Sequence, residues 1–336
     1  MHITVLTGRR AAAAASALAL LAGSAAAQER VTFGTNWLPQ AEHGGFYQAM
    51  ADGTYAACGL EVEIVPGGPQ VNNRALMMAG RIDFHMGGNL LELFSAAQEG
   101  IPIVGVAAAF QKEPQVLLTH PGVADTWEAM RELPVLFIGD AGFASYYQWM
   151  IAAHGFTPEQ RQVYTFNPAP FIANPNSGMQ GYLSSEPFAV EQEAGFAPNV
   201  FLIADYGWNT YSTIIETMAD TIANRREVVE CFVEGSIKGW YTFLYGDNSA
   251  GVEAIMAANP EMGMDKIDFA IAKMLSEGIV DSGDTLELGI GAMTEERVAS
   301  FFELMVEAGV VDADIDWTAS VDFSFVNQGL GLDMRP

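Results

Sequence analysis

Lysine is scarce in this chain of 336 residues and occurs only at Lys112, Lys238, Lys266 and Lys273. The 41 acidic residues outnumber the 15 lysines and arginines, so the formal net charge is −26 at pH 7. A field of this sign repels phosphate groups and anionic lipids. The composition therefore argues against nucleic acid and against the membrane surface as binding partners.

Cysteine is equally rare, with Cys58 and Cys231 the only two in the chain. The sequence has no CxxC, no HExxH and no His/Cys cluster at metal-ligand spacing, so neither a metal site nor a bound cofactor is expected. A single disulfide remains open in an exported chain. We favour two separate buried thiols, because the sequence does not supply the Cα separation that a bridge requires.

Long apolar runs are also missing, and the one near the N-terminus is too short for a membrane span, which needs about 20 residues. It occupies residues 11–21, follows Arg9 and Arg10, and leads to the small residues Ala25–Ala27. This order predicts a secretory signal peptide over residues 1–27, cleaved near Ala27, and a periplasmic location. Sec and twin-arginine export both remain open.

What the chain does have is a large apolar fraction, 50% hydrophobic and 11% aromatic, which suits a substantial core. Strand-like segments alternate with helical ones over the first two thirds, and this predicts an α/β fold with helices covering the sheets. The predicted strands are 31–33, 60–65, 82–86, 101–108, 133–139, 162–166 and 200–204. The predicted helices are 46–51, 71–79, 89–97, 144–153, part of 171–183, 222–244, 251–258, 266–277 and 295–308.

One segment carries a family resemblance. Residues 36–49, NWLPQAEHGGFYQA, resemble the opening of periplasmic substrate-binding proteins of ABC importers. The nearest group is the NMT1/THI5-like set, which includes binders of thiamine-precursor pyrimidines and, more distantly, of nitrate, taurine and alkanesulfonates. The segments 55–64, AGRIDF at 79–84 and GYLSSEP at 181–187 agree with it.

The resemblance implies a type II periplasmic binding protein fold: two lobes with mixed sheets flanked by helices, a hinge, and a helical C-terminal tail. Lobe 1 is expected to hold residues 28–112 and 206–336, and lobe 2 the inserted residues 113–205. The hinge strands are expected near 107–116 and 202–206. In such open α/β sheets a ligand lies at the carboxyl ends of the strands, here between the lobes.

The expected site residues follow from those strand ends. Asn36 and Trp37 follow the first strand, and an indole face can stack a flat heterocycle; the alternative is a core tryptophan. Asn89 opens a helix whose free backbone N–H groups suit a carbonyl or an anion, although plain capping by Asn89 explains it as well. Ser145 occupies the equivalent junction in the second unit.

Further candidates come from the resemblance. In the pyrimidine-binding relatives a tyrosine and a glutamate at positions like Tyr182 and Glu186 stack on and hydrogen-bond to an aminopyrimidine, a charge-assisted pairing. Glu186 could equally be a solvated surface acid. His43, Phe46 and Tyr146 are candidate ligand contacts, each with a structural or core role as its alternative.

These observations predict a solute-binding protein that is not an enzyme. The expected ligand is hydroxymethyl- or formylamino-pyrimidine; riboflavin or a small anion such as a sulfonate, taurine or nitrate is the alternative. The expected partners are this small molecule and the importer's membrane permease, and a monomer is expected. A pyrimidine-synthase-like enzyme with a lysine-bound pyridoxal phosphate is disfavoured, since the cysteines stand alone and no lysine falls in an expected cleft loop. A sensing or chaperone-like role is a third reading.

Overall fold

The computed structural model describes residues 1–2, 28–69 and 71–336. The predicted signal peptide therefore lies outside the described residues, apart from its first two. Within the described part of the chain, no helix is both long enough and apolar enough to cross a membrane.

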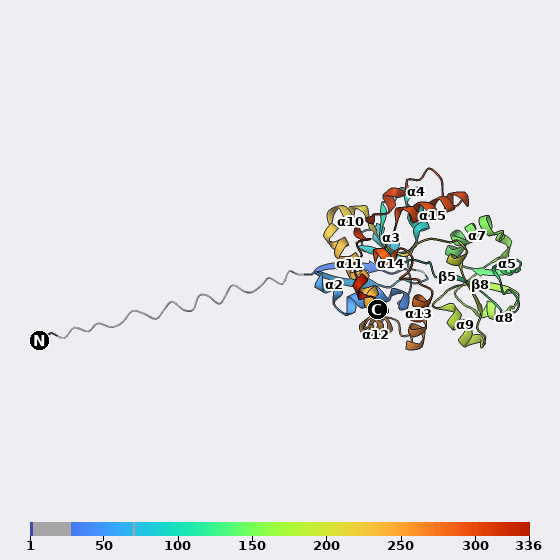
Figure 1. Cartoon of the computed structure of the whole chain (residues 1–336), viewed down its shortest axis with the longest axis horizontal. Coiled ribbons are helices and arrows are strands. Elements are labelled where there is room, and N and C mark those ends of the chain that lie inside the picture. Colours follow the sequence, from blue (N-terminus) through green and yellow to red (C-terminus); the bar gives the residue numbers. More distant parts are fainter. Residues whose placement is uncertain (3–27, 70) are drawn as a thin grey trace.

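Figure 1 shows the chain folded into two bodies, each built on its own five-stranded mixed sheet. We call the body on the first sheet lobe 1; its strands lie in the order β2-β1-β3-β10-β4. β1 pairs in parallel with β2 and β3, whereas β10 runs antiparallel to both β3 and β4. The strands are β1 Glu29–Gly34, β2 Leu60–Val65, β3 Phe84–Asn89, β4 Ile103–Phe110 and β10 Ser212–Met218.

Lobe 2 repeats this topology in the order β7-β6-β8-β5-β9. Here β6 is parallel to β7 and β8, and β5 is the antiparallel strand between β8 and β9. The strands are β5 Gln115–Thr119, β6 Val135–Ile138, β7 Arg161–Val163, β8 Ser177–Tyr182 and β9 Asn199–Leu202. Its helices are α5 Trp127–Met130, α6 Asp140–Ala144, α7 Tyr146–His154, α8 Ala169–Ala173 and α9 Glu186–Ala194.

The chain passes between the lobes twice, through residues 111–114 and 207–211, and each passage leads into an antiparallel strand, β5 or β10. This arrangement confirms the predicted fold class, two mixed sheets flanked by helices. The structure also contains the strands β5 and β10, which the periodicity of the sequence did not predict. Of the segment 171–183, predicted to be helical in part, the start is helical up to Ala173, whereas Ser177–Tyr182 is the central strand β8, which the sequence did not predict.

The remaining helices cover lobe 1, including most of the C-terminal part of the chain (Figure 1). The N-terminal part of the chain supplies α1 Gly44–Ala51, α2 Thr54–Ala57, α3 Asn73–Met78 and α4 Leu90–Gln98. The C-terminal part supplies α10 Ala219–Asn224, α11 Arg226–Tyr245, α12 Ser249–Ala258, α13 Met264–Ser276, α14 Thr285–Leu288 and α15 Glu295–Glu307. The predicted helical tail is therefore confirmed.

The glycine pair in the family-like segment lets α1 approach α11 closely. A Cβ on Gly45 would stand 2.3 Å from the indole of Trp240, and one on Gly239 would stand 2.1 Å from the carbonyl oxygen of Gly45. Side chains at these positions would push the helices apart. The close packing fixes the N-terminus of α1 and, with it, the turn η1 (Ala41–His43) that precedes it.

The two cysteines are joined, which corrects the expectation of separate thiols. Cys58 follows α2 and Cys231 lies on α11, with their Cα atoms 5.9 Å apart and a disulfide between them. Tyr55 of α2 brings the segments together: its ring stacks on Phe232 at 5.2 Å and its hydroxyl lies 2.8 Å from that of Ser236. Tertiary packing thus supplies a proximity that residues 173 apart in sequence do not reveal.

Candidate ligand-binding site between the lobes

The first passage between the lobes places a buried carboxyl group at their junction. Glu113, 6% exposed, accepts hydrogen bonds from Asn89 Nδ2 at 3.0 Å and from the indole N–H of Trp208 in the second passage. Trp208 in turn packs on Trp149 of lobe 2 at 5.4 Å and on Phe301 of lobe 1 at 5.0 Å. Glu113 therefore joins both passages to the end of β3, a position that the sequence reading missed.

Trp37 lies at the lobe boundary on a loop whose backbone is fixed by two hydrogen bonds. Thr35 Oγ1 donates to the Trp37 carbonyl at 2.8 Å, and the Gly67 N–H donates to the same oxygen at 3.1 Å. The indole is half-buried, and its centroid is 4.9 Å from that of Phe166 in lobe 2. Phe166 has a φ of 61°, a left-handed conformation that costs a non-glycine residue about 1–3 kcal/mol. Aromatic rings from both lobes thus meet here.

A second contact between the lobes joins two buried side chains. The hydroxyl of Ser184, which lies just after β8, donates a hydrogen bond to the carboxyl group of Glu42 in η1. Burial raises the pKa of Glu42, and the serine hydroxyl offsets part of that rise. Both residues lie within segments that carried the family resemblance, yet neither was a predicted site residue.

Tyr182 and Glu186 stand together at the end of β8 and the start of α9. The Tyr182 N–H donates to Glu186 Oε2 at 2.7 Å. Burial raises the pKa of Glu186 to about 7, and the charge of Glu42 adds to the rise. Burial also raises the pKa of the Tyr182 hydroxyl, with Glu113 and Glu42 contributing. Ser184, which binds Glu42, lies between Tyr182 and Glu186, and the Leu183 N–H donates to the carbonyl oxygen of Pro114, the residue after Glu113, at 2.8 Å. The predicted pair therefore lies near both carboxyl groups that the sequence analysis missed.

Tyr146 and Asn89 were also predicted site residues. Tyr146 is 1% exposed and its hydroxyl donates to Gln180 Oε1 at 3.2 Å. Burial raises the pKa of Tyr146, and the charges of Glu113 and Glu186 raise it further. Asn89 caps α4 through a 3.0 Å bond from the Leu91 N–H while its amide binds Glu113. Asn89 therefore both caps α4 and lies at the junction between the lobes.

The predicted free N–H groups at the strand ends are already bonded within the protein. The Gly88 N–H donates to Glu92 Oε2 at 3.1 Å, and the Leu91 N–H binds Asn89. At the matching junction in lobe 2 the Gly139 N–H donates to Gln180 Oε1 at 2.6 Å. These side-chain acceptors occupy the positions that an anion would take.

Four predicted residues have other surroundings. Phe46 is a correction: it is fully buried in the lobe 1 core, 4.6 Å from Phe33, because α1 turns that face toward the sheet. Ser145 donates its hydroxyl to the Ala141 carbonyl at 2.8 Å, so it serves a local turn. Asn36 is exposed. His43 is buried, its Nδ1 has no hydrogen-bond partner among the residues that the structure describes, and burial lowers its pKa to about 3, which leaves the ring neutral.

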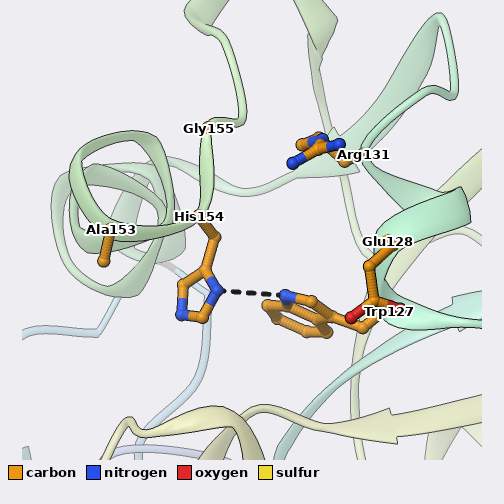
Figure 2. A pocket seen from close by; sticks show the side chains of 6 residues that line it. All are labelled: Trp127, Glu128, Arg131, Ala153, His154 and Gly155. Carbon is orange, nitrogen blue, oxygen red and sulfur yellow. Dashed lines mark hydrogen bonds between the residues drawn. The ribbon is translucent and has the colours of Figure 1, made fainter.

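Two surface pockets lie elsewhere and contain none of the predicted residues. Figure 2 shows the first, of about 390 Å³, between Trp127 and His154 in lobe 2. The Trp127 indole donates to His154 Nδ1 at 3.2 Å, and burial lowers the pKa of this histidine, so both groups already have a hydrogen-bond partner within the protein. The second, of about 470 Å³, borders the disulfide and the start of α11. Neither gathers groups from both lobes.

The fold is that of periplasmic binding proteins. The ligand-binding component of an ABC-type import system from Staphylococcus aureus, with zinc bound, has a TM-score of 0.65 at 14% identity over 90% of this chain and 99% of that chain. The aliphatic sulphonate binding protein SsuA from Escherichia coli has a TM-score of 0.60 at 12% identity, over 88% and 92%. An enzyme shares the fold too: the desulfurization enzyme DSZB has a TM-score of 0.54 at 13% identity, over 90% and 99%.

The family model described as NMT1/THI5 like matches residues 40–246, which is more than half of the chain. The chain belongs to the NMT1/THI5-like family, as its opening segment indicated. No curated protein matches the sequence.

Proposed function

We propose that this protein is the extracytoplasmic solute-binding component of an ABC importer, and that it captures a small planar amino-heterocycle between its lobes. The observation that carries the proposal is that two contacts cross the boundary between the sheets: Trp37 packs on Phe166, and Glu42 binds Ser184, which lies between Tyr182 and Glu186. The ring centroids of Trp37 and Phe166 are 4.9 Å apart, and those of Phe166 and Tyr164 are 5.5 Å apart. Aromatic faces from both lobes are therefore contiguous, and a carboxyl group lies on the lobe 2 side of the same boundary at Glu186.

These groups suit an aminopyrimidine. Ring faces from both lobes can stack a flat heterocycle, and such contacts contribute about 0.5–1.5 kcal/mol each beyond area burial. A carboxylate accepts hydrogen bonds from an exocyclic amine and a ring N–H. We propose hydroxymethyl- or formylamino-pyrimidine as the ligand class, with riboflavin as the alternative flat heterocycle.

The proposed mechanism is hinge closure. A ligand that touches both lobes binds the closed state better than the open one and so favours closure. The closed protein then docks on the membrane permease of the importer, acting as a periplasmic monomer. Lobe 2 is the moving lobe in this proposal, with residues 111–114 and 207–211 as the hinge.

A thermal-shift panel tests the ligand class. Purified protein is melted with hydroxymethylpyrimidine, formylaminopyrimidine, riboflavin, taurine or nitrate, and binders are measured by calorimetry. A ligand at 100 times its Kd stabilises the protein by about 2.7 kcal/mol. We expect a shift with the pyrimidines. Shifts with taurine or nitrate alone would overturn the heterocycle proposal.

An enzymatic role is the second candidate, favoured only by the fold shared with DSZB. Among the described residues both cysteines are joined in the disulfide, so no free thiol is present there to act as a nucleophile. Lys112 lies in the first hinge segment, where it is paired with Asp205 at 3.2 Å. An enzymatic role would be favoured if mass spectrometry of the purified protein detected pyridoxal phosphate bound to a lysine, or if the protein converted the bound pyrimidine into a product.

A further inference from the structure

Both passages between the lobes are bonded to one side chain, that of Arg297 on α15. Its Nη2 donates to the backbone carbonyl oxygen of Gln111 in the first passage and, at 3.2 Å, to that of Thr210 in the second. Its Nη1 also donates to Gln111 Oε1, at 3.3 Å. A single guanidinium group from lobe 1 therefore holds the backbone of both passages.

Two further side chains hold the guanidinium group of Arg297 in place. Its Cζ lies 4.1 Å from the ring centroid of Tyr211, and its Nη1 lies 3.5 Å from Asp284 Oδ2. The Tyr211 hydroxyl donates to the same carboxylate oxygen and accepts from the Thr294 N–H at 2.9 Å. A planar guanidinium group with five N–H donors can stack on a ring and bind several acceptors at once, whereas a lysine ammonium group cannot.

A second contact from lobe 1 holds the same end of the first passage. The N–H groups of Gln111 and Lys112 donate to the carbonyl oxygen of Ile279, in the connection between α13 and α14, at 2.7 and 3.2 Å. Arg335 fixes this connection through two bonds to the carboxylate of Asp281, at 2.8 and 2.6 Å. The first residues of this passage are therefore attached to lobe 1.

The opposite ends of the passages are bonded to lobe 2. The carbonyl oxygen of Pro114 accepts from the Leu183 N–H, and the Gly207 N–H donates to the carbonyl oxygen of Ala204 at 3.3 Å. Because each passage is held by lobe 1 at one end and by lobe 2 at the other, the backbone rotations of closure are confined to the few residues between. These are residues 113, 208 and 209.

Resting on the hinge closure of the proposed function, we infer that Arg297 is a positioning residue for the interlobe site. By binding the carbonyl oxygens of both passages it fixes the direction in which they leave lobe 1, and with it the orientation in which lobe 2 closes. Without these bonds each passage can also pivot at its lobe 1 end. The two lobes then sample a wider range of relative orientations.

Distances between the lobes in the unliganded protein test this inference. Phe188 of α9 lies 5.3 Å from Phe269 of α13, so these helices face one another across the lobe boundary. Spin labels on Glu191→Cys in lobe 2 and Glu253→Cys in lobe 1, both exposed positions, report the separation by double electron–electron resonance. Both native cysteines are joined in the disulfide and do not take up the label. We expect Arg297→Lys to broaden the distance distribution toward longer values.

Arg226→Lys is the matched control. Arg226 on α11 also pairs with an acid, Glu230 at 2.9 Å, and its Cζ also lies over an aromatic ring, 4.4 Å from the centroid of Phe325, but neither partner belongs to a passage. This variant should keep the wild-type distance distribution. Urea unfolding of both variants separates a loss of stability, which a merely structural arginine would also cause, from the change in distance.

Asp284→Asn gives the same test if Arg297→Lys does not fold. The Asp284 side chain is 29% exposed, and an asparagine keeps an oxygen for the Tyr211 hydroxyl while removing the charge that pairs with Arg297. We expect a similar broadening of smaller extent. A wild-type distribution in folded Arg297→Lys, or in Asp284→Asn where the first variant is unfolded, would overturn the inference.

The inference and the proposed function fail in different ways. If hydroxymethylpyrimidine shifts the wild-type distribution to shorter distances, Arg297→Lys should bind it about 10-fold more weakly, because its closed state is less populated. If the pyrimidine closes both proteins from identical distributions and with equal affinity, the role of Arg297 is overturned while the proposed function stands. If no solute of the thermal-shift panel binds or alters the wild-type distribution, the proposed function falls, and a broader distribution in unliganded Arg297→Lys would still support the role of Arg297 in holding the passages.

Discussion

Trp37 of lobe 1 and Phe166 of lobe 2 pack across the lobe boundary with their ring centroids 4.9 Å apart. Trp37→Ala removes one wall of the proposed site, and we expect hydroxymethylpyrimidine to bind about 10-fold more weakly or worse. Because the indole is only half-buried, the melting temperature of the unliganded protein should change little. Calorimetry and thermal melting measure the two effects.

Trp317→Ala provides the control for Trp37→Ala, since Trp317 is also partly exposed but packs on Phe302 of α15, within lobe 1. It should leave the affinity unchanged. A Trp37→Ala variant that binds as tightly as wild type would discard the stacking role.

Ser184 and Glu42 supply a second prediction. Ser184→Ala leaves a buried carboxyl without its hydroxyl donor in the closed form, at a cost of about 1–3 kcal/mol, whereas water can solvate Glu42 when the lobes separate. We expect the unliganded variant to be more open, with a larger radius of gyration in X-ray scattering. Ser185→Ala is the control, because the backbone N–H bond of Ser185 to Tyr182 survives that change. Identical scattering for both variants would contradict the prediction.

The sequence predicted those parts of the fold that depend on local pattern. β2 and α4 each carry a regular apolar repeat and lie within two residues of their expected bounds. The periodicity did not reveal β5 and β10, because each takes its place from antiparallel pairing with distant strands. The same limit applied to Ser177–Tyr182, whose glycines and polar residues hide a central strand.

The residues of the candidate site also fall into two groups, those that the sequence predicted and those that it did not. Tyr182, Glu186 and Trp37 were expected at the boundary because the resemblance covers their segments, and the structure places them there. Glu113 and Phe166 lie outside those segments. Glu113 is placed by its bond to Trp208 in the second passage, and Phe166 by packing of lobe 2 against Trp37. Phe46 shows the converse: it lies inside a matching segment, but helix α1 directs it into the core.

The raised pKa of Glu113 predicts how stability depends on pH. Because the pKa rises from 4.5 unfolded to about 7 folded, the native state holds a proton that the unfolded chain releases in this range. Stability contributed by this group is present below pH 4.5 and is lost as pH rises toward 7, at about 1.4 kcal/mol per pH unit.

Glu113→Gln should flatten this slope. The measurement is urea unfolding of the unliganded protein between pH 5 and 7.5, with the slope rather than the absolute free energy of unfolding as the readout. Glu191→Gln should keep the wild-type slope, since that acid is exposed. Equal slopes in wild type and Glu113→Gln would show that the carboxyl does not carry a shifted pKa.

The disulfide joins α2 to α11 within lobe 1, remote from the proposed site, and so separates stability from binding. Replacing both cysteines, Cys58→Ser with Cys231→Ser, removes a cross-link between residues 173 apart and should lower the free energy of unfolding by roughly 2–5 kcal/mol. Affinity for the pyrimidine at a temperature where both proteins are folded should be unchanged, because Tyr55 still packs on Phe232. Reduction with dithiothreitol should reproduce the loss in wild type and add nothing in the double variant. If the oxidised and reduced wild-type proteins unfold at the same urea concentration, the bond does not contribute to stability.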